Sequence, residues 1–424
     1  MRSLKGMVGV LVIVVLVLLM GISPSVASNP NELVVYHWWT AGGEKEAVHA
    51  LFKAFLKHYP HAKIVENPVA GGGGGIMRSQ IKAMIMAGNP PDTFQITYGK
   101  GMIKSFASVL QPIDSLLVNF DVPKEVIEWG TVDGHMYGVP INIMQNNCLW
   151  YNEKLVHKLG IHMPIKSVDE FLSVCEKIRK EGYVPLAVGA GMGQKFWLGT
   201  LFETIMLAVP DGGAKVLKKY YAGKLDVTKS RAFKEALEVL RKLVVKKLVN
   251  SDFSALTWDQ AADLMASGRA VFYVMGDWAK GHFTSMKLKP NVDFGYQSFP
   301  GTEGIFLGHS DCFVLPKGVK KKLAKDWLKF LTTAEAETAF CPIKGATPPR
   351  LDAPVKGIYD SMSIAILKKF RNPKVVKVLS QFGAPPESYL DVFGTAFSKF
   401  FQNPVVNDKQ LNMFKAAYEE VFGY

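Results

Sequence analysis

Just after its apolar N-terminus, the chain alternates short apolar runs with amphipathic segments, and this alternation restricts the fold more than any other feature. Residues 33–39 (LVVYHWW) predict a strand, and residues 44–60 have the apolar spacing of a helix. A second strand at 62–70, a helix that opens in GGGGG (71–75) and a third strand after the proline-marked turn at 89–92 continue the order. A βαβαβ order predicts a parallel-type sheet with helices on its faces, so the expected class is α/β.

The rest of the chain is predicted to be richer in helix. Ser167 and Glu170 form a capping box for a helix, and Asp133-Gly134 predicts a hairpin turn. Strands are expected again at 270–274, 293–299 and 312–316. At 424 residues the chain is too long for one core, so two lobes are expected. There is no internal repeat and no low-complexity linker, which favours a chain that crosses between its lobes several times.

The N-terminus has the pattern of an export signal. Arg2 and Lys5 provide a positive start, Met7–Ile22 is an unbroken apolar run, and small residues precede a cleavage point near Ser28. The run is short for a membrane span, which needs about 20 residues. We therefore expect an exported protein, periplasmic or extracellular, with residues 1–27 as its signal peptide; an uncleaved anchor at the membrane surface is the alternative.

The distribution of charges and the spacing of histidines argue against a nucleic-acid-binding protein and against a metal-binding protein. The net charge of +13 comes from 50 Lys and Arg against 37 Asp and Glu, and the cations are spread through helix-like segments without a nucleic-acid-binding motif. We expect a solvated, Lys-rich surface and no nucleic-acid partner. The nine histidines have no metal-ligand spacing, so neither a metal nor another cofactor is expected. The four cysteines, which lack paired spacing, are expected to be free and buried, with one disulfide as the alternative.

Five stretches place aromatic rings beside charged or amide side chains at predicted strand ends and turns. In open α/β sheets a ligand sits in the crevice at the carboxyl ends of the strands. The pyranose ring of a sugar has apolar faces that pack on aromatic rings, and its hydroxyls bond strongly to ionised Asp, Glu and Lys. These stretches therefore predict a carbohydrate site. They are HWWTAGGE (37–44), PPDTFQIT (90–97), LTWDQAA (256–262), VMGDWAKG (274–281) with GHSDCFVLP (308–316), and CPIKGATPPR (341–350).

Each of these residues also has an ordinary structural interpretation. Neighbouring side chains of a strand point to opposite faces, so one of Trp38 and Trp39 is expected to belong to the core. Asp277 and Asp311 could cap turns, and Lys344 could be a solvent-exposed cation. Only the joint occurrence of these residues favours the carbohydrate site.

Two other kinds of site are weaker alternatives. The run Gly71–Gly75 lacks both the Lys-Ser/Thr of a P-loop and the spacing of a dinucleotide motif. We interpret it as a flexible loop that lets the backbone approach the cleft, or as a tolerant surface turn. A glycoside hydrolase needs two carboxylates at a fixed separation, which Glu44, Asp277 and Asp311 could supply, but no spacing demonstrates such a pair. We therefore assign no catalytic residue and do not expect an enzyme.

The same stretches resemble the extracellular sugar-binding proteins of ABC transporters, and most closely the bacterial glucose/mannose/galactose-binding proteins. The similarity runs from about Glu32 to the region of Ser388, nearly the whole mature chain. GNPPD alone also occurs in binders of longer sugars, whereas the combination is specific to the family. It is carried by HWWTAGGE, GNPPDTFQ, YGVPINIMQNNCLWYN, VFYVMGDWAKG and IKGATPPRLD.

The resemblance implies a type II periplasmic-binding-protein fold, with two α/β lobes joined by several crossings. It implies high-affinity capture of a monosaccharide, glucose first and mannose or galactose next, and delivery to the permease of an ABC transporter by hinge closure. A di- or oligosaccharide, another solute such as a peptide or polyamine, and a secreted glycoside hydrolase are the alternatives. The implied partners are the sugar and the permease subunits, and a monomer is expected. The predicted lobes are 28–143 plus 297–330 and 144–296 plus 331–424, with crossings near Asn142–Asn146, Phe294–Ser298 and Leu331–Ala334.

Family positions map onto this sequence residue by residue. Thr97 and Gln381 stand where the closest family pattern has His, and one extra residue separates Trp39 from Glu44. Each departure touches the side chains that meet the hydroxyl rim, so the choice among sugars is left open. The resemblance implies that the sugar is contacted by Trp38 or Trp39, Glu44, Gln95, Trp258, Asp311 and Lys344. It places Asp277 and Trp278 at the edge of the cleft, and Thr97 and Gln381 are the two positions that differ from the family pattern.

Overall fold

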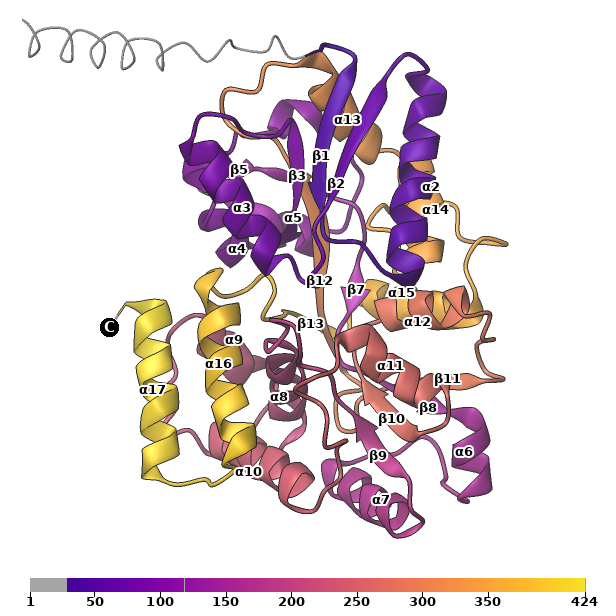
Figure 1. Cartoon of the computed structure of the whole chain (residues 1–424), viewed down its shortest axis with the longest axis vertical. Coiled ribbons are helices and arrows are strands. Elements are labelled where there is room, and N and C mark those ends of the chain that lie inside the picture. The colour runs from indigo at the N-terminus through magenta and orange to yellow at the C-terminus, as the bar shows by residue number, and fades with distance from the viewer. Residues whose placement is uncertain (1–28, 118, 424) are drawn as a thin grey trace, which may run out of the picture.

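The computed structural model describes residues 29–117 and 119–423. The chain forms two lobes stacked along the long axis of the molecule, each a β-sheet with helices packed around it (Figure 1). This arrangement confirms the predicted α/β class. The predicted signal peptide, residues 1–27, lies outside the described residues.

The first lobe, at the top of Figure 1, contains a sheet that has seven strands among the described residues. Their order is β13-β12-β3-β1-β2, and β6 and β7 pair onto β12. β1 pairs in parallel with both β2 and β3, as the βαβαβ pattern predicts, and β12 runs antiparallel to β3. The carboxyl ends of β1 and β3 therefore meet at one edge of the sheet. The strands are β1 (Glu32–His37), β2 (Lys63–Pro68), β3 (Thr93–Tyr98), β6 (Gly138–Pro140), β7 (Met144–Gln145), β12 (Ile305–Val314) and β13 (Val376–Leu379).

β12 differs from its prediction. The sequence predicts a strand at 312–316, whereas β12 begins seven residues earlier, at Ile305. Its first residues pair with β13 and β7, which come from distant parts of the chain. Because these partners are not local, no sequence pattern around Ile305 signals the strand, and β13 itself was not predicted.

Local sequence determines the helices and turns of the first lobe more directly. α2 (Gly42–His58) buries Val48, Leu51 and Phe55 at helical spacing. The turn at Asp133-Gly134 has positive φ at both residues and joins β4 (Thr131–Val132) to β5 (His135–Met136), as predicted. The remaining helices are α3 (Gly75–Met86), α4 (Lys100–Lys104), η1 (Ala107–Val109), η2 (Asp114–Leu116), α5 (Lys124–Gly130), α13 (Lys322–Leu331) and α14 (Ala334–Lys344).

The second lobe contains a sheet with the order β11-β8-β10-β9 within the described residues. Its strands are β8 (Cys148–Asn152), β9 (Val184–Ala187), β10 (Ala270–Val274) and β11 (Phe294–Ser298). The Ser167 hydroxyl caps α7 by accepting from the Glu170 amide at 3.2 Å, while the Glu170 carboxylate accepts from the Lys166 amide. Apart from α13 and α14 of the first lobe, the helices described after β8 are α6 (Glu153–Lys158), α7 (Val168–Lys180), α8 (Trp197–Ala208), α9 (Ala214–Tyr221), α10 (Arg231–Val245), α11 (Trp258–Ala266), α12 (Trp278–Ser285), α15 (Ser361–Arg371), α16 (Ser388–Gln402) and α17 (Asp408–Phe422).

The chain passes between the lobes through separate segments. One runs from β6 to β8 and another from β11 to β12. The first of these is tied to the residues after α14, because the Ile143 amide donates to the Thr347 carbonyl at 2.7 Å. The predicted lobe boundaries stay a prediction, but α14 packs against α2, which favours a third passage after Lys344 and not near Leu331.

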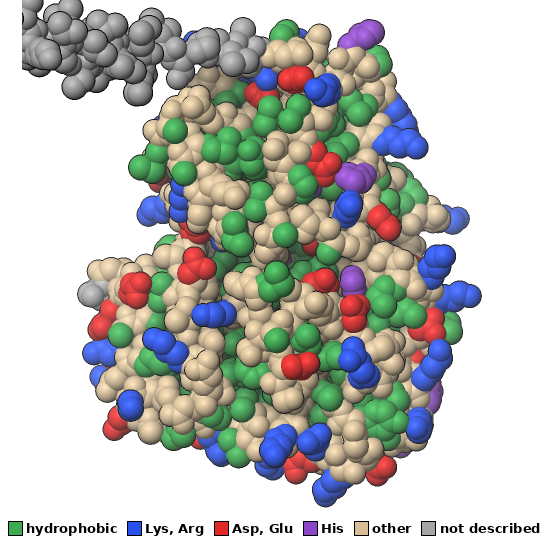
Figure 2. Space-filling view, in the orientation of Figure 1, with side chains coloured by type: hydrophobic (Ala, Val, Ile, Leu, Met, Phe, Trp, Pro, Cys, Tyr) green, Lys and Arg blue, Asp and Glu red, His purple; other side chains and the backbone are tan. Residues whose placement is uncertain are grey.

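Several findings concern the described residues as a whole. Cys148, Cys175, Cys312 and Cys341 are all buried and free. Residues 29–117 and 119–423 contain no cluster of His, Cys, Asp or Glu arranged to hold a metal ion. None of the described helices is both long and apolar enough to cross a membrane. Figure 2 shows basic side chains interspersed with acidic ones over this face of both lobes.

Candidate functional site

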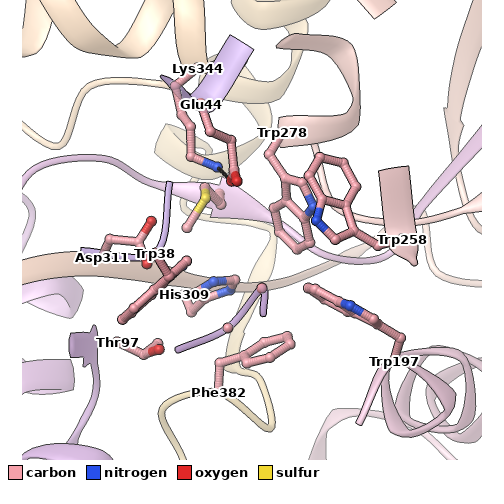
Figure 3. A pocket seen from close by; sticks show the side chains of 13 residues that line it. Trp38, Glu44, Thr97, Trp197, Trp258, Trp278, His309, Asp311, Lys344 and Phe382 are labelled. Atoms are coloured by element: carbon pink, nitrogen blue, oxygen red, sulfur yellow. Dashed lines mark hydrogen bonds and ion pairs between the residues drawn. The ribbon is translucent and has the colours of Figure 1, made fainter. Parts of the chain in front are cut away.

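Most of the predicted site residues meet in one pocket between the two lobes (Figure 3). The pocket encloses about 370 Å³ of space between atoms, a figure that includes the part open to solvent. The first lobe contributes residues from strand ends and from helices α2 and α14. The pocket is lined by Trp38, Glu44, Gly72, Gly73, Thr97, Met144, Trp197, Trp258, Trp278, His309, Asp311, Lys344 and Phe382.

The second lobe contributes three tryptophans that occupy equivalent positions in three helices. Trp197, Trp258 and Trp278 are the first residues of α8, α11 and α12. The first amides of these helices already have acceptors: the Trp197 amide donates to the Gln194 carbonyl and the Trp258 amide to the Gln194 side-chain oxygen. The second lobe therefore presents three rings to the pocket, an arrangement suited to a ligand with apolar faces.

The tryptophan pair after β1 is divided between pocket and core, as the period of a strand predicts. Trp38 lines the pocket, and its amide donates to the Gln95 side-chain oxygen at 3.1 Å. Trp39 is fully buried, and its ring centre lies 4.6 Å from that of Phe340 and 5.8 Å from that of Phe313. Trp38 is thus the available ring of the pair, and Trp39 anchors the strand end.

Glu44 and Lys344 form an ion pair inside the pocket. The Lys344 ammonium donates to Glu44 Oε1 at 2.5 Å and lies 5.5 Å from the centre of the Trp278 ring. Glu44 is in the first turn of α2 and Lys344 in the last turn of α14, positions where the helix dipole favours an acid and a base respectively. Lys344 is therefore a buried cation and not the solvent-exposed one that the ordinary interpretation of its loop allows.

Asp311 lies on β12 directly opposite Thr97 of β3. Its amide donates to the Asn142 side-chain oxygen at 2.8 Å, and its carboxylate accepts from the Asn142 side-chain nitrogen at 3.2 Å. Burial raises the pKa of the Asp311 carboxyl to about 6, although the Lys344 charge opposes the rise. Gln95 supports the site from behind without lining it, because its side-chain oxygen accepts from the Trp38 amide.

Two predicted residues are turned away from the pocket. The Asp277 carboxylate is fully buried and accepts from the Gln145 amide at 3.0 Å, and burial raises its pKa to about 8. Gln381 donates through its side-chain nitrogen to the Phe196 carbonyl at 2.8 Å and to the Thr200 hydroxyl at 2.7 Å. Asp277 thus holds the β7 segment, and Gln381 fixes the start of α8.

Six residues that line the pocket were not named as site residues, although one interpretation of the glycine run had its backbone approaching the cleft. They are Gly72, Gly73, Met144, Trp197, His309 and Phe382. His309 precedes Asp311 by two residues and shares its face of β12, so a correct start for that strand would have found it. Burial lowers the pKa of His309 to about 3, which keeps its ring neutral, and its Nδ1 lies 2.8 Å from the Asn146 side-chain oxygen. Trp197 and Phe382 carried no local signal, because each follows residues that are typical of a loop.

Comparisons with known proteins show the family and the fold. Residues 41–338 match the family model described as bacterial extracellular solute-binding protein. An uncharacterised ABC transporter extracellular-binding protein of Pyrococcus horikoshii is 36% identical over 94% of this chain and 90% of its own length. A probable sugar-binding periplasmic protein of Mesorhizobium japonicum is 31% identical over 89% of this chain and 91% of its own. A solved chitin oligosaccharide binding protein has a TM-score of 0.81 at 19% identity, covering 93% of this chain and 99% of its own.

Proposed function

Because this chain belongs to the bacterial extracellular solute-binding protein family, we propose that it is the sugar receptor of an ABC transporter. It captures a monosaccharide between its two lobes outside the cytoplasmic membrane and delivers it to the permease subunits. Glucose is the first candidate, followed by mannose and galactose. The chain acts by binding, not by catalysis.

One observation carries this proposal: ring faces from both lobes and a small set of charged groups converge on one pocket. Trp38 lies across the pocket from the tryptophans that begin α8, α11 and α12, and Glu44, Lys344 and Asp311 also line the pocket (Figure 3). The rings match the apolar faces of a pyranose, and the charged groups match its hydroxyls. Glu44 and Lys344 neutralise each other, which leaves the Asp311 carboxylate to accept hydrogen bonds from sugar hydroxyls.

The walls of the pocket support a small sugar. Aromatic rings line it from both lobes, and the polar groups between them are few: Glu44, Thr97, His309, Asp311 and Lys344. A di- or oligosaccharide remains the second candidate, because more open states of the lobes would enlarge the pocket. A polyamine is disfavoured because such a cation needs several unpaired carboxylates, whereas Glu44 is already paired with Lys344.

Closure of the lobes explains how binding is transmitted. The sugar touches residues of both lobes only when they are closed, so it has a higher affinity for the closed state and shifts the population toward it. The closed receptor then docks on the permease, and ATP is used by other subunits of the transporter.

The proposal is tested by titrating tryptophan fluorescence with glucose, mannose, galactose and short oligosaccharides, and by calorimetry with the same sugars. Four tryptophans line the pocket, so we expect a large fluorescence change that saturates in the micromolar range or below. Micromolar binding corresponds to about 8 kcal/mol, which a few charge-assisted bonds and stacked rings supply. A flat response to every sugar in both assays rejects the function.

A second measurement distinguishes a receptor from a hydrolase. The protein is incubated with chromogenic glycosides and oligosaccharides, and the products are separated by chromatography. A receptor leaves them intact. Product release at a rate that rises with protein concentration would favour a glycosidase, with Glu44 or Asp311 as one of its carboxylates.

A further inference from the structure

The glycine run that follows β2 adopts backbone angles that residues with a side chain rarely adopt. Gly71, Gly72, Gly73 and Gly74 have φ of 141°, 56°, 56° and 76°, and Gly75 begins α3. Consecutive residues with positive φ are costly for any residue other than glycine. The loop therefore needs glycines to keep this path.

The path brings the bare main chain of the first lobe against the second lobe. A Cβ atom on Gly73 would lie 2.9 Å from the Phe196 ring, and one on Gly72 would lie 3.3 Å from the Trp258 ring and 3.4 Å from the Gln194 amide. Gly72 and Gly73 themselves line the pocket. The loop thus forms a wall of the pocket and touches the second lobe at the same residues.

One buried arginine fixes this wall. Arg78, in the first turns of α3, is 2% exposed, and its guanidinium donates to the Gly73 carbonyl. Its Nε donates to Glu387 Oε1 at 2.8 Å, and Glu387 is the residue before α16, which packs on α8 in the second lobe. Burial of an unpaired arginine would be costly, so the guanidinium is stable here only while both partners are in place.

We infer that the Gly71–Gly75 loop is the main-chain gate of the binding pocket and that Arg78 is its positioning residue. The guanidinium links the gate to Glu387, so the pocket wall is complete only when the two lobes are together. The gate retains the bound molecule by slowing its release, and it leaves the rings and charges of the pocket to determine which molecule enters. This inference rests on the proposed function only for the identity of the ligand used as a probe.

The first experiment compares Arg78→Gln with Lys82→Gln. Lys82 also pairs with Glu387, but it is half-exposed and its ammonium lies against Glu387 and the Phe106 ring and not against the loop, so it is a matched control. Stopped-flow tryptophan fluorescence with glucose, or with the best sugar of the titration, gives the association and dissociation rates. We expect Arg78→Gln to raise the dissociation rate and Kd at least tenfold with little change in the association rate, Lys82→Gln to stay within twofold, and Arg78→Lys to recover part of the loss.

The second experiment uses two glycines with the same backbone angle. Gly74 (φ 76°) and Gly88 (φ 77°) flank α3, but a Cβ atom on Gly74 would overlap the Trp38 ring, whereas nothing lies within 4 Å of one on Gly88. Alanine costs a similar backbone strain at both positions. We expect Gly74→Ala to weaken binding at least tenfold and Gly88→Ala to leave Kd unchanged, with both proteins folded by circular dichroism.

The outcomes separate the gate from the proposed function. If wild-type protein binds sugar and the dissociation rates of Arg78→Gln and Gly74→Ala match it, the gate is wrong and the receptor function stands. If wild-type protein binds no sugar, the function is wrong, and small-angle X-ray scattering of the ligand-free proteins decides on the gate. The gate then requires a larger radius of gyration for Arg78→Gln than for wild type and Lys82→Gln, and equal radii reject it.

Discussion

Replacing Asp311 by Asn tests the central electrostatic feature of the pocket. Asn has nearly the same shape as Asp, so the change removes the charge while the side chain can still pair with Asn142. A hydrogen bond to a charged group contributes about 1.5–3 kcal/mol, and one such bond from the carboxylate to a sugar hydroxyl would be weakened. Since about 1.4 kcal/mol is a factor of ten, we expect Kd to rise by roughly ten- to one-hundredfold.

The pKa of Asp311 adds a second, independent expectation. Burial raises this pKa to about 6, so the carboxylate is mostly ionised near neutral pH and protonates as the pH falls through 6. The ionised form accepts hydroxyls more strongly, so affinity is full above the pKa and is lost below it. Between about pH 7.5 and about pH 5 the ionised fraction falls roughly tenfold, and wild-type Kd should rise by a similar factor.

The neighbouring titratable groups change their charge mostly outside the pH range in which Asp311 titrates. Asp277 has a pKa raised to about 8 and His309 one lowered to about 3, so neither changes most of its charge near pH 6. Isothermal titration calorimetry at a series of pH values measures Kd for wild type and for Asp311→Asn. The variant should bind weakly and with little dependence on pH between 5 and 7.5. A variant that keeps wild-type affinity, or that keeps the wild-type pH dependence, refutes the assignment of Asp311 to the ligand.

Three further predictions concern the tryptophan pair, the buried ion pair and stabilisation by the bound sugar. Trp38→Ala should weaken sugar binding at least tenfold with a small change in melting temperature, whereas Trp39→Ala should destabilise the fold by about 3–5 kcal/mol in denaturant unfolding; equal stability losses would contradict the division of the pair. Lys344→Gln leaves the Glu44 carboxylate buried without its cation and should lower the unfolding free energy by about 3–5 kcal/mol, and a loss under 1 kcal/mol would place the pair in solvent. The bound sugar at 100 times its Kd should stabilise the protein by about 2.7 kcal/mol in a thermal-shift assay, and no shift with a sugar that binds by calorimetry would mean that the unfolded chain binds it too.

Local sequence was sufficient for those parts of the molecule whose structure depends on near neighbours. The spacing of apolar residues located α2, Ser167 located the start of α7, and the Asp133-Gly134 turn located its hairpin. The two-residue period of a strand also predicted that Trp38 and Trp39 would be divided between pocket and core. These features follow from backbone geometry within a few residues, which is why a single sequence contains them.

The tertiary structure decided which side chains share the pocket. Glu44 and Lys344 are 300 residues apart and form a hydrogen bond because α2 packs on α14. His309 enters the pocket because β12 begins earlier than its own sequence indicates, held by partners from other parts of the chain. Gln381 belongs to the same region of the fold but bonds to α8 and not to the pocket.

The amino-acid sequence alone therefore determined the α/β class, the positions of α2 and α7 and the residue types of the candidate site. It could not determine which tryptophan of the pair faces the ligand, that three helices of the second lobe begin with a ring at the pocket, or that the glycine loop touches Phe196. Those facts depend on how two sheets are ordered and on how the lobes meet. Sheet order and lobe contact arise from pairings between distant segments, whose energies are summed over the whole fold and leave no trace in the spacing of neighbouring residues.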